Sequence, residues 1–175
     1  MNLPSPKITG APIRIEFRPA LTSWRGKLLS GDHRGEPIHA TSFLRKRSIV
    51  LDSELAQDWP ELSRILVHEL FHFAWVRLGN PMRLSYEDLL RVELESGALG
   101  ELGWSAEWRK KALKPTDIAQ RNRKWREYVA ESFCDTAAFL YSDCAHHDEY
   151  TIKNRWRQQR MCWYAEHLEK RSIPL

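Results

Sequence analysis

Two histidines and a glutamate with helical spacing are the residues of this sequence best suited to chemistry. His68, Glu69 and His72 stand within Ile65–Val76, where every other residue is apolar. Residues four apart lie one above the other on a helix, so both imidazoles can bind one ion, and imidazole nitrogens suit zinc. Glu69 is displaced by about 100° around the helix axis, so it can reach a water on the metal without being a ligand. In this HExxH pattern the metal acidifies the water and the glutamate accepts its proton.

An alternative without metal treats these residues as part of an ordinary core. Two core histidines could be satisfied by neighbouring groups, with Glu69 paired to an arginine. A helix that is apolar all round is predicted to be buried, and three polar side chains there cost free energy unless something satisfies them. A bound ion does so for both histidines, and we therefore favour the metal site.

A catalytic zinc site needs a third protein ligand and one position for water. No histidine follows in Phe73–Leu78, but Glu131 and Asp135 are the only charged residues of Tyr128–Tyr141 and lie four apart. Two carboxylates on an otherwise apolar helix repel each other unless a cation is near. We expect Glu131 to bind the ion and Asp135 to accept a hydrogen bond from a ligand histidine. Rival third ligands are Glu93, Glu95, His146 and His147.

The remaining cysteines and basic stretches have simpler interpretations. Three cysteines without framework spacing predict reduced thiols in the cytoplasm, and we interpret Cys134 as a small buried hydrophobe, although its thiol could approach the metal. The formal charge of +4 is small compared with the basic excess of a dedicated nucleic-acid-binding protein. Arginines surround tryptophans in 121–126 and 155–160, which is compatible with nucleic-acid contact; a solvated helix face with the tryptophans turned inward is the favoured interpretation. No signal peptide and no run of about eighteen apolar residues is present, so we expect no membrane contact.

The elements that must position these residues predict an α+β fold. We expect a mobile lead-in over 1–12 and one domain over 13–175, in which a small, mostly antiparallel N-terminal sheet packs on a helical body. Asp58 and Pro60 mark the start of the His68 helix, and Gly79-Asn80-Pro81 its end. The expected strands are Ile13–Phe17, Gly26–Leu29, Ile38–Leu44 and Ser48–Asp52. The expected helices are 58–78, 85–96, 105–113, a long helix starting at Thr116 or Asn122 and reaching Tyr141, and 149–170.

HExxH followed at a distance by Glu131-Ser-Phe-Cys-Asp135 resembles the gluzincin zinc metallopeptidases. The segment is also similar to the second helix of minimal gluzincin and ImmA/IrrE-type proteins, although these commonly carry Gly where Phe71 stands. The resemblance covers about residues 45–141. It implies a zincin-like fold with the strand Ser48–Asp52 bordering the cleft, and one Zn²⁺ held by His68, His72 and Glu131. It further implies that Glu69 is the general base and that Asp135 orients a ligand.

The function predicted is therefore that of a zinc-dependent peptidase, a hydrolase acting on a peptide or protein substrate. A further donor should stabilise the oxyanion; the candidates are Tyr128, Tyr141, His146 and His147. A second hypothesis is a non-catalytic, zinc-stabilised domain that binds protein or nucleic acid. A nucleic-acid-associated protease of the SprT-like kind combines the two. No feature of the sequence indicates an oligomeric state.

Overall fold

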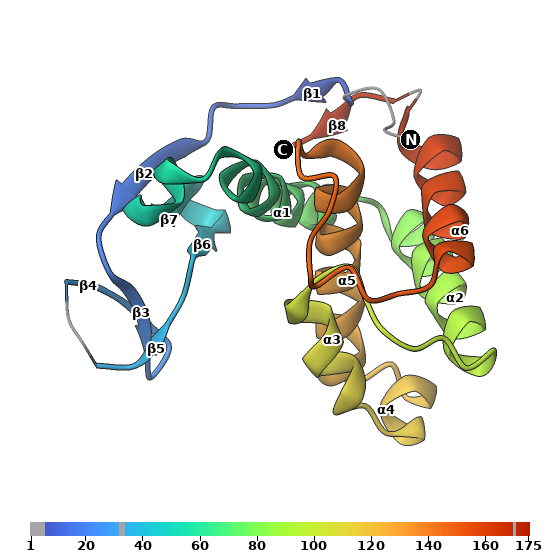
Figure 1. Cartoon of the computed structure of the whole chain (residues 1–175). Helices are drawn as coiled ribbons and strands as arrows, with labels where there is room; N and C mark the ends of the chain where they lie inside the picture. The colour runs from blue at the N-terminus through green and yellow to red at the C-terminus, as the bar shows by residue number, and fades with distance from the viewer. Residues whose placement is uncertain (1–5, 32–33, 170) are drawn as a thin grey trace.

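The computed structural model describes residues 6–31, 34–169 and 171–175 and has an α+β architecture. Within these residues there are six α-helices and eight short strands, with most strands before the first helix (Figure 1). None of the helices in these ranges is both long enough and apolar enough to cross a membrane.

The sheet nearest to the helices has the order β2-β7-β6 and is mixed. Strand β7 (Ser48–Asp52) lies in its centre, because Ile49-Val50-Leu51 is apolar and buried on both faces. β2 (Arg14–Arg18) pairs with β7 in parallel, whereas β6 (Ala40–Phe43) pairs with it antiparallel. The prediction of β7 is confirmed residue for residue, but β6 forms the edge of the sheet on the side of α1 (Trp59–Arg77).

A second sheet, β4-β3-β5, projects from the first as an arm (Figure 1). Its centre, β3 (Leu21–Trp24), was not predicted, and it pairs antiparallel with β4 (Lys27–Ser30) and β5 (Glu36–Pro37). The strand predicted over Ile38–Leu44 is shorter in the structure, where β6 covers Ala40–Phe43 and β5 ends at Pro37. The Asp52 carboxylate accepts a hydrogen bond from the Leu21 amide at 2.7 Å, which ties the arm to the end of β7.

Helices α1 and α5 (Arg123–Tyr141) pack against each other and carry the predicted chemistry. The α1 start is confirmed: the Asp58 side chain accepts the Glu61 amide hydrogen at 3.2 Å. Asn122 caps α5 in the same way, and the rings of Phe71 and Phe133 meet 5.8 Å apart between the helices. Burial of α1 on all sides is not observed, because the side that carries His68 is open to a cleft.

The other helices differ from the predictions at their ends. α2 (Asn80–Glu95) begins five residues before Ser85, because Pro81 belongs to its first turn rather than ending the helix before it. α3 (Trp104–Lys111) follows the predicted glycine loop, and α4 (Pro115–Ala119) precedes α5 as a separate turn. α6 (Asn154–Tyr164) begins later than predicted and continues as a wider turn over Ala165–Glu169.

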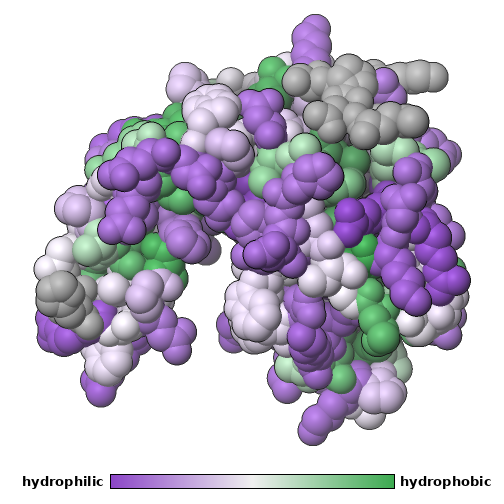
Figure 2. All heavy atoms as spheres, in the orientation of Figure 1, coloured by the Kyte–Doolittle hydropathy of each residue, from purple (hydrophilic) through white to green (hydrophobic). Residues whose placement is uncertain are grey.

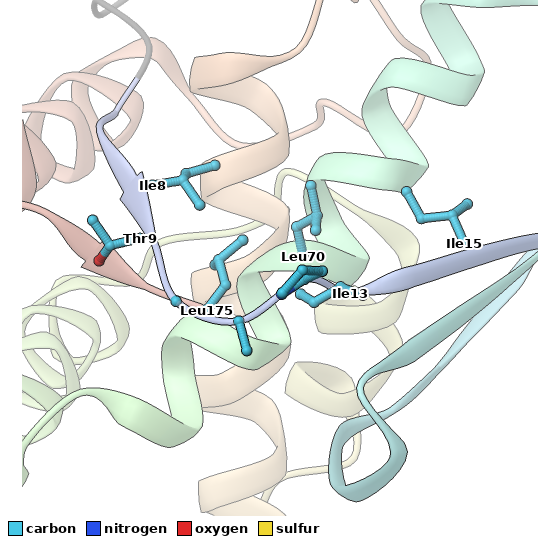
Figure 3. A pocket seen from close by; sticks show the side chains of 9 residues that line it. Ile8, Thr9, Ile13, Ile15, Leu70 and Leu175 are labelled. Atoms are coloured by element: carbon cyan, nitrogen blue, oxygen red, sulfur yellow. The ribbon is translucent and has the colours of Figure 1, made fainter.

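Part of the predicted mobile lead-in is ordered. β1 (Ile8–Thr9) pairs in parallel with β8 (Ile173–Pro174), so the expectation is wrong for these residues, whereas residues 1–5 lie outside those described. An apolar cavity of about 260 Å³ lies next to β1 (Figure 3). It is lined by Ile8, Thr9, Gly10, Ala11, Pro12, Ile13, Ile15, Leu70 and Leu175. This lining contains no titratable side chain.

Candidate metal centre

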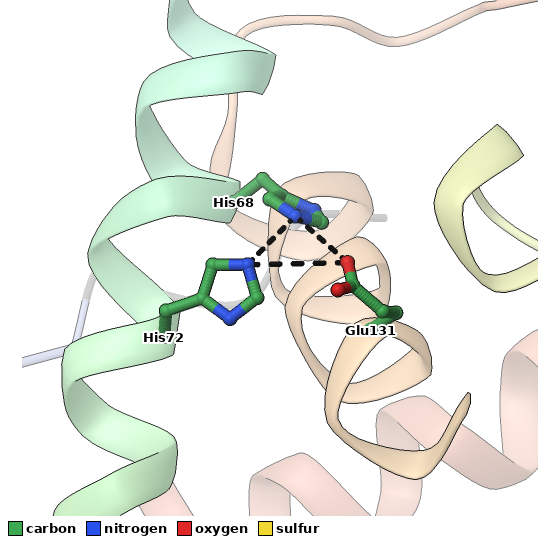
Figure 4. Close-up of side chains that lie close together, drawn as sticks. All are labelled: His68, His72 and Glu131. Carbon is green, nitrogen blue, oxygen red and sulfur yellow. Dashed lines mark hydrogen bonds and ion pairs between the residues drawn. The ribbon is translucent and has the colours of Figure 1, made fainter. Parts of the chain in front are cut away.

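The two packed helices bring His68, His72 and Glu131 to one point (Figure 4). His68 and His72 project from α1 and Glu131 from the facing side of α5. The two Nε2 atoms are 3.1 Å apart, and Glu131 Oε2 lies 3.4 Å from His68 Nε2 and 3.9 Å from His72 Nε2. Among the described residues, these three are the ones whose ligand atoms converge in this way.

The donor set and its spacing fit a zinc ion. Ligands bound to tetrahedral zinc at about 2.0–2.1 Å are about 3.3 Å from one another, and the three separations lie on both sides of that value. Two imidazoles with one carboxylate are a ligand set of catalytic zinc sites, which keep a fourth position for water. All three side chains are partly buried, so one side of the group remains accessible.

Asp135 connects the metal centre to α3. His68 Nδ1 donates to Asp135 Oδ1 at 2.7 Å, and the amide of Ala106 donates to Oδ2 at 3.1 Å. Gly103, the N-cap of α3, has no side chain that could accept a hydrogen bond from the first turn of the helix. A Cβ atom there would overlap the Asp135 carboxylate. Asp135 therefore fixes the ring of His68 and caps a neighbouring helix with the same carboxylate.

The neighbouring charges and burial set the protonation of the three candidate ligands. Burial disfavours a charged His68 ring, but the Asp135 carboxylate, helped by Glu131 and Glu69, outweighs it and raises the pKa of His68. Burial and the neighbouring His68 lower the pKa of His72. Burial raises the pKa of Glu131, but its contacts with His68 and His72 and the charge of Arg109 outweigh this and lower it to about 2. His72 is thus a neutral donor, Glu131 is anionic, and His68 must release a proton when a cation binds.

Glu69 lies beside the three ligands without belonging to them. Its Oε2 accepts a hydrogen bond from the hydroxyl of Ser42 on β6, and the same hydroxyl contacts the Glu69 carbonyl oxygen at 3.1 Å. Ser42 therefore holds the carboxylate between the edge strand and the metal centre. Glu69 lies next to the group of His68, His72 and Glu131 without being one of its members, which is the arrangement that the HExxH pattern predicts.

Two cavities extend from Glu69 along β6. Each has a volume of about 350 Å³ or slightly less, and they share Ala40, His68, Glu69 and Ser105. One continues along residues 37–40 and the other along residues 40–44. The surface is hollowed between the β4-β3-β5 arm and the limb formed by α3 and α4 (Figure 2). The strand that borders the cleft is β6. The resemblance implied β7 at this place, but β6 covers that edge of β7.

Arg109 lines the cavity next to the candidate metal centre, and it was not predicted. It comes from α3, and its Nη2 lies 3.2 Å from Glu131 Oε1, the oxygen facing away from the histidines. Its position depends on how α3 packs on α5, where the Ala106 amide contacts Asp135, and no local sequence motif indicates this packing. A guanidinium beside a metal ligand offers further N–H donors to a substrate oxygen.

The predicted oxyanion donors lie elsewhere. Tyr128 is fully buried and donates to Glu101 at 2.7 Å, Tyr141 stacks on Phe71, and His147 contacts Glu61, while His146 is exposed. None of them lines either cavity of the cleft. The rival third ligands are also displaced: Glu93 pairs with the buried Arg160 at 2.6 Å, and Glu95 is exposed.

The tryptophans of the two basic stretches face inward, as the favoured interpretation predicts. Trp125 is fully buried and donates to Glu87 at 2.9 Å, and Trp156 is also buried. Their rings are therefore not available for stacking on bases. Comparisons with protein-family models, with curated proteins and with solved structures found no match.

Proposed function

We propose that this protein is a zinc-dependent peptidase with a zincin-like arrangement of its sheet and of helices α1 and α5. The observation that carries the proposal is the convergence of His68, His72 and Glu131, with Glu69 beside them at the wall of an open cleft. A purely structural zinc site would be closed by a fourth protein ligand. Among the described residues, no fourth ligand atom joins this group.

The residues of the cleft have separate roles in the proposed reaction. When bound, zinc acidifies a water and polarises the carbonyl of the substrate. Glu69 accepts the proton of the attacking water at its carboxylate and passes it to the leaving amine. Ser42 keeps this carboxylate in place through its hydroxyl. Arg109 donates hydrogen bonds from its N–H groups to the substrate oxygen, on which negative charge develops.

An extended peptide is the substrate that suits the shape of the cleft. β6 pairs only with β7 among the described strands, so its outer edge has free backbone donors and acceptors. A peptide can add to such an edge as a further strand. Both cavities follow the segment 37–44 and pass Glu69 on either side, which leaves room for residues before and after the scissile bond.

The variant Glu69→Gln tests the proposal. The amide keeps the size of the side chain but cannot accept the proton, so we expect zinc content to be unchanged and hydrolysis of a quenched peptide library to fall by about 10²-fold or more. Glu95→Gln, at an exposed glutamate, is the matched control and should be fully active. Full hydrolysis by zinc-loaded Glu69→Gln would exclude Glu69 as the base, and wild-type protein without zinc at this site would exclude the metal centre.

A further inference from the structure

We propose that Cys134 is a positioning residue of the metal site, which holds His72 through its second ring nitrogen; the inference rests on the proposed zinc centre but not on hydrolysis. Cys134 Sγ lies 3.4 Å from His72 Nδ1. The other nitrogen of the ring, Nε2, is the one that faces His68 and Glu131. The thiol therefore lies behind the imidazole and outside the group of ligand atoms.

The contact decides which nitrogen of His72 carries the proton. A histidine that binds a metal through Nε2 has its hydrogen on Nδ1 and usually donates it to a carboxylate, a carbonyl or a water. Here the partner is sulfur, a weak acceptor. Cys134 is fully buried, so bulk water does not reach the sulfur, and its hydrogen bond to Nδ1–H leaves Nε2 with a lone pair for the ion.

The position of the sulfur fits a partner of the ring rather than a ligand of the ion. The ligand atoms that converge belong to His68, His72 and Glu131, and Cys134 Sγ is not among them. One turn of α5 then contains everything that it contributes to the site: Glu131 binds the ion, Cys134 orients His72 and Asp135 orients His68.

Zinc affinity measured by competition with a chromophoric chelator tests the assignment. Cys134→Val keeps the approximate volume but removes the acceptor, and we expect it to weaken zinc binding by about 10-fold or more. Cys134→Ser restores an acceptor and should bind more tightly than Cys134→Val. Cys144→Val, at a buried cysteine in a separate apolar cluster, is the matched control and should bind zinc like the wild type.

Two measurements on the wild-type protein keep the test independent of how the variants fold. Nitrogen NMR of the zinc-loaded protein should show the proton of His72 on Nδ1, and the cobalt-substituted protein should lack a thiolate-to-cobalt absorption band. Wild-type affinity in folded Cys134→Val, a proton absent from Nδ1, or a thiolate band would each overturn the role. None of these readouts uses turnover, so a protein that binds zinc through this arrangement without cleaving peptides would contradict only the proposed function.

Discussion

The carboxylate of Asp135 is shared between His68 Nδ1, 2.7 Å from Oδ1, and the first turn of α3, where the Ala106 amide lies 3.1 Å from Oδ2. The orientation of the His68 ring is thereby coupled to the position of a helix that forms the opposite wall of the cleft. α3 in turn supplies Arg109, which contacts Glu131. Asp135 and Glu131 of α5 are therefore both linked to α3, the first through the backbone of Ala106 and the second through the side chain of Arg109.

Replacing Asp135 with Asn should weaken zinc binding. The amide is uncharged, so its oxygen accepts the hydrogen of His68 Nδ1 more weakly than the carboxylate does and adds no negative charge behind the ring. We expect zinc affinity to fall by about 10–100-fold, measured by chelator competition. Glu127→Gln, at a half-buried glutamate two turns away that pairs with Arg123, should leave zinc affinity unchanged. Equal affinities of Asp135→Asn and wild type would show that the contact does not tune the ligand.

Replacing Gly103 with Ala should disturb the metal site from a distance. The added Cβ would overlap the Asp135 carboxylate, which must then move away from His68 or from α3. We expect lower zinc affinity together with a loss of about 1–3 kcal/mol in the free energy of unfolding. Gly79→Ala is a matched control at another helix start, where the added Cβ meets only Pro81 at an ordinary 3.7 Å. Similar zinc affinity for both variants would contradict the coupling.

The parts of the candidate metal centre that lie on one face of one helix could be predicted from the sequence. Spacings of four residues place His68 above His72 and Glu131 one turn before Asp135, and the structure brings these residues together. Arg109 could not be predicted, because its distance from Glu131 depends on how α3 packs on α5. The same reason explains the displaced Tyr128: spacing puts it one turn from Glu131, but packing turns its hydroxyl to Glu101.

The fold was predictable where the local signal was strong. Asp58 and Asn122 are helix caps with clear side-chain acceptors, and both helices begin there. Pro81 was ambiguous, since a proline two residues after a glycine can follow one helix or belong to the first turn of the next. β3 was missed because its pairing with β4 and β5 depends on the loops that join them rather than on its own pattern of apolar residues.

Replacing Arg109 with Met should separate binding of the metal from turnover. The guanidinium contacts the Glu131 oxygen that faces away from the histidines, so its loss should change zinc affinity less than Asp135→Asn does. If it stabilises charge on the substrate, kcat should fall by about 10²-fold, with a smaller effect on KM. Arg45→Met, at an exposed arginine after β6, is the control for the loss of one positive charge. Unchanged kcat would remove Arg109 from the reaction.

The buried carboxylate of Glu87 should make stability depend on pH in the acid range. Burial raises the pKa of Glu87, but hydrogen bonds from Arg121 at 2.7 and 2.8 Å and from Trp125 at 2.9 Å outweigh it and lower the pKa below its usual 4.5. Because the folded value is below the unfolded one, this stabilisation is complete above about pH 4.5 and is lost as pH falls through the folded value.

Glu87→Gln should therefore reduce the free energy of unfolding by about 1–3 kcal/mol at pH 7. Its deficit relative to the wild type should shrink as pH is lowered from 5 to 3, because the wild-type carboxylate then also becomes neutral. Urea unfolding at equal zinc concentration across this range measures both effects. Glu127→Gln, whose partner Arg123 is exposed, should change stability by less than about 1 kcal/mol. A deficit of Glu87→Gln that stays constant with pH would mean that it arises from packing and not from the charge of Glu87.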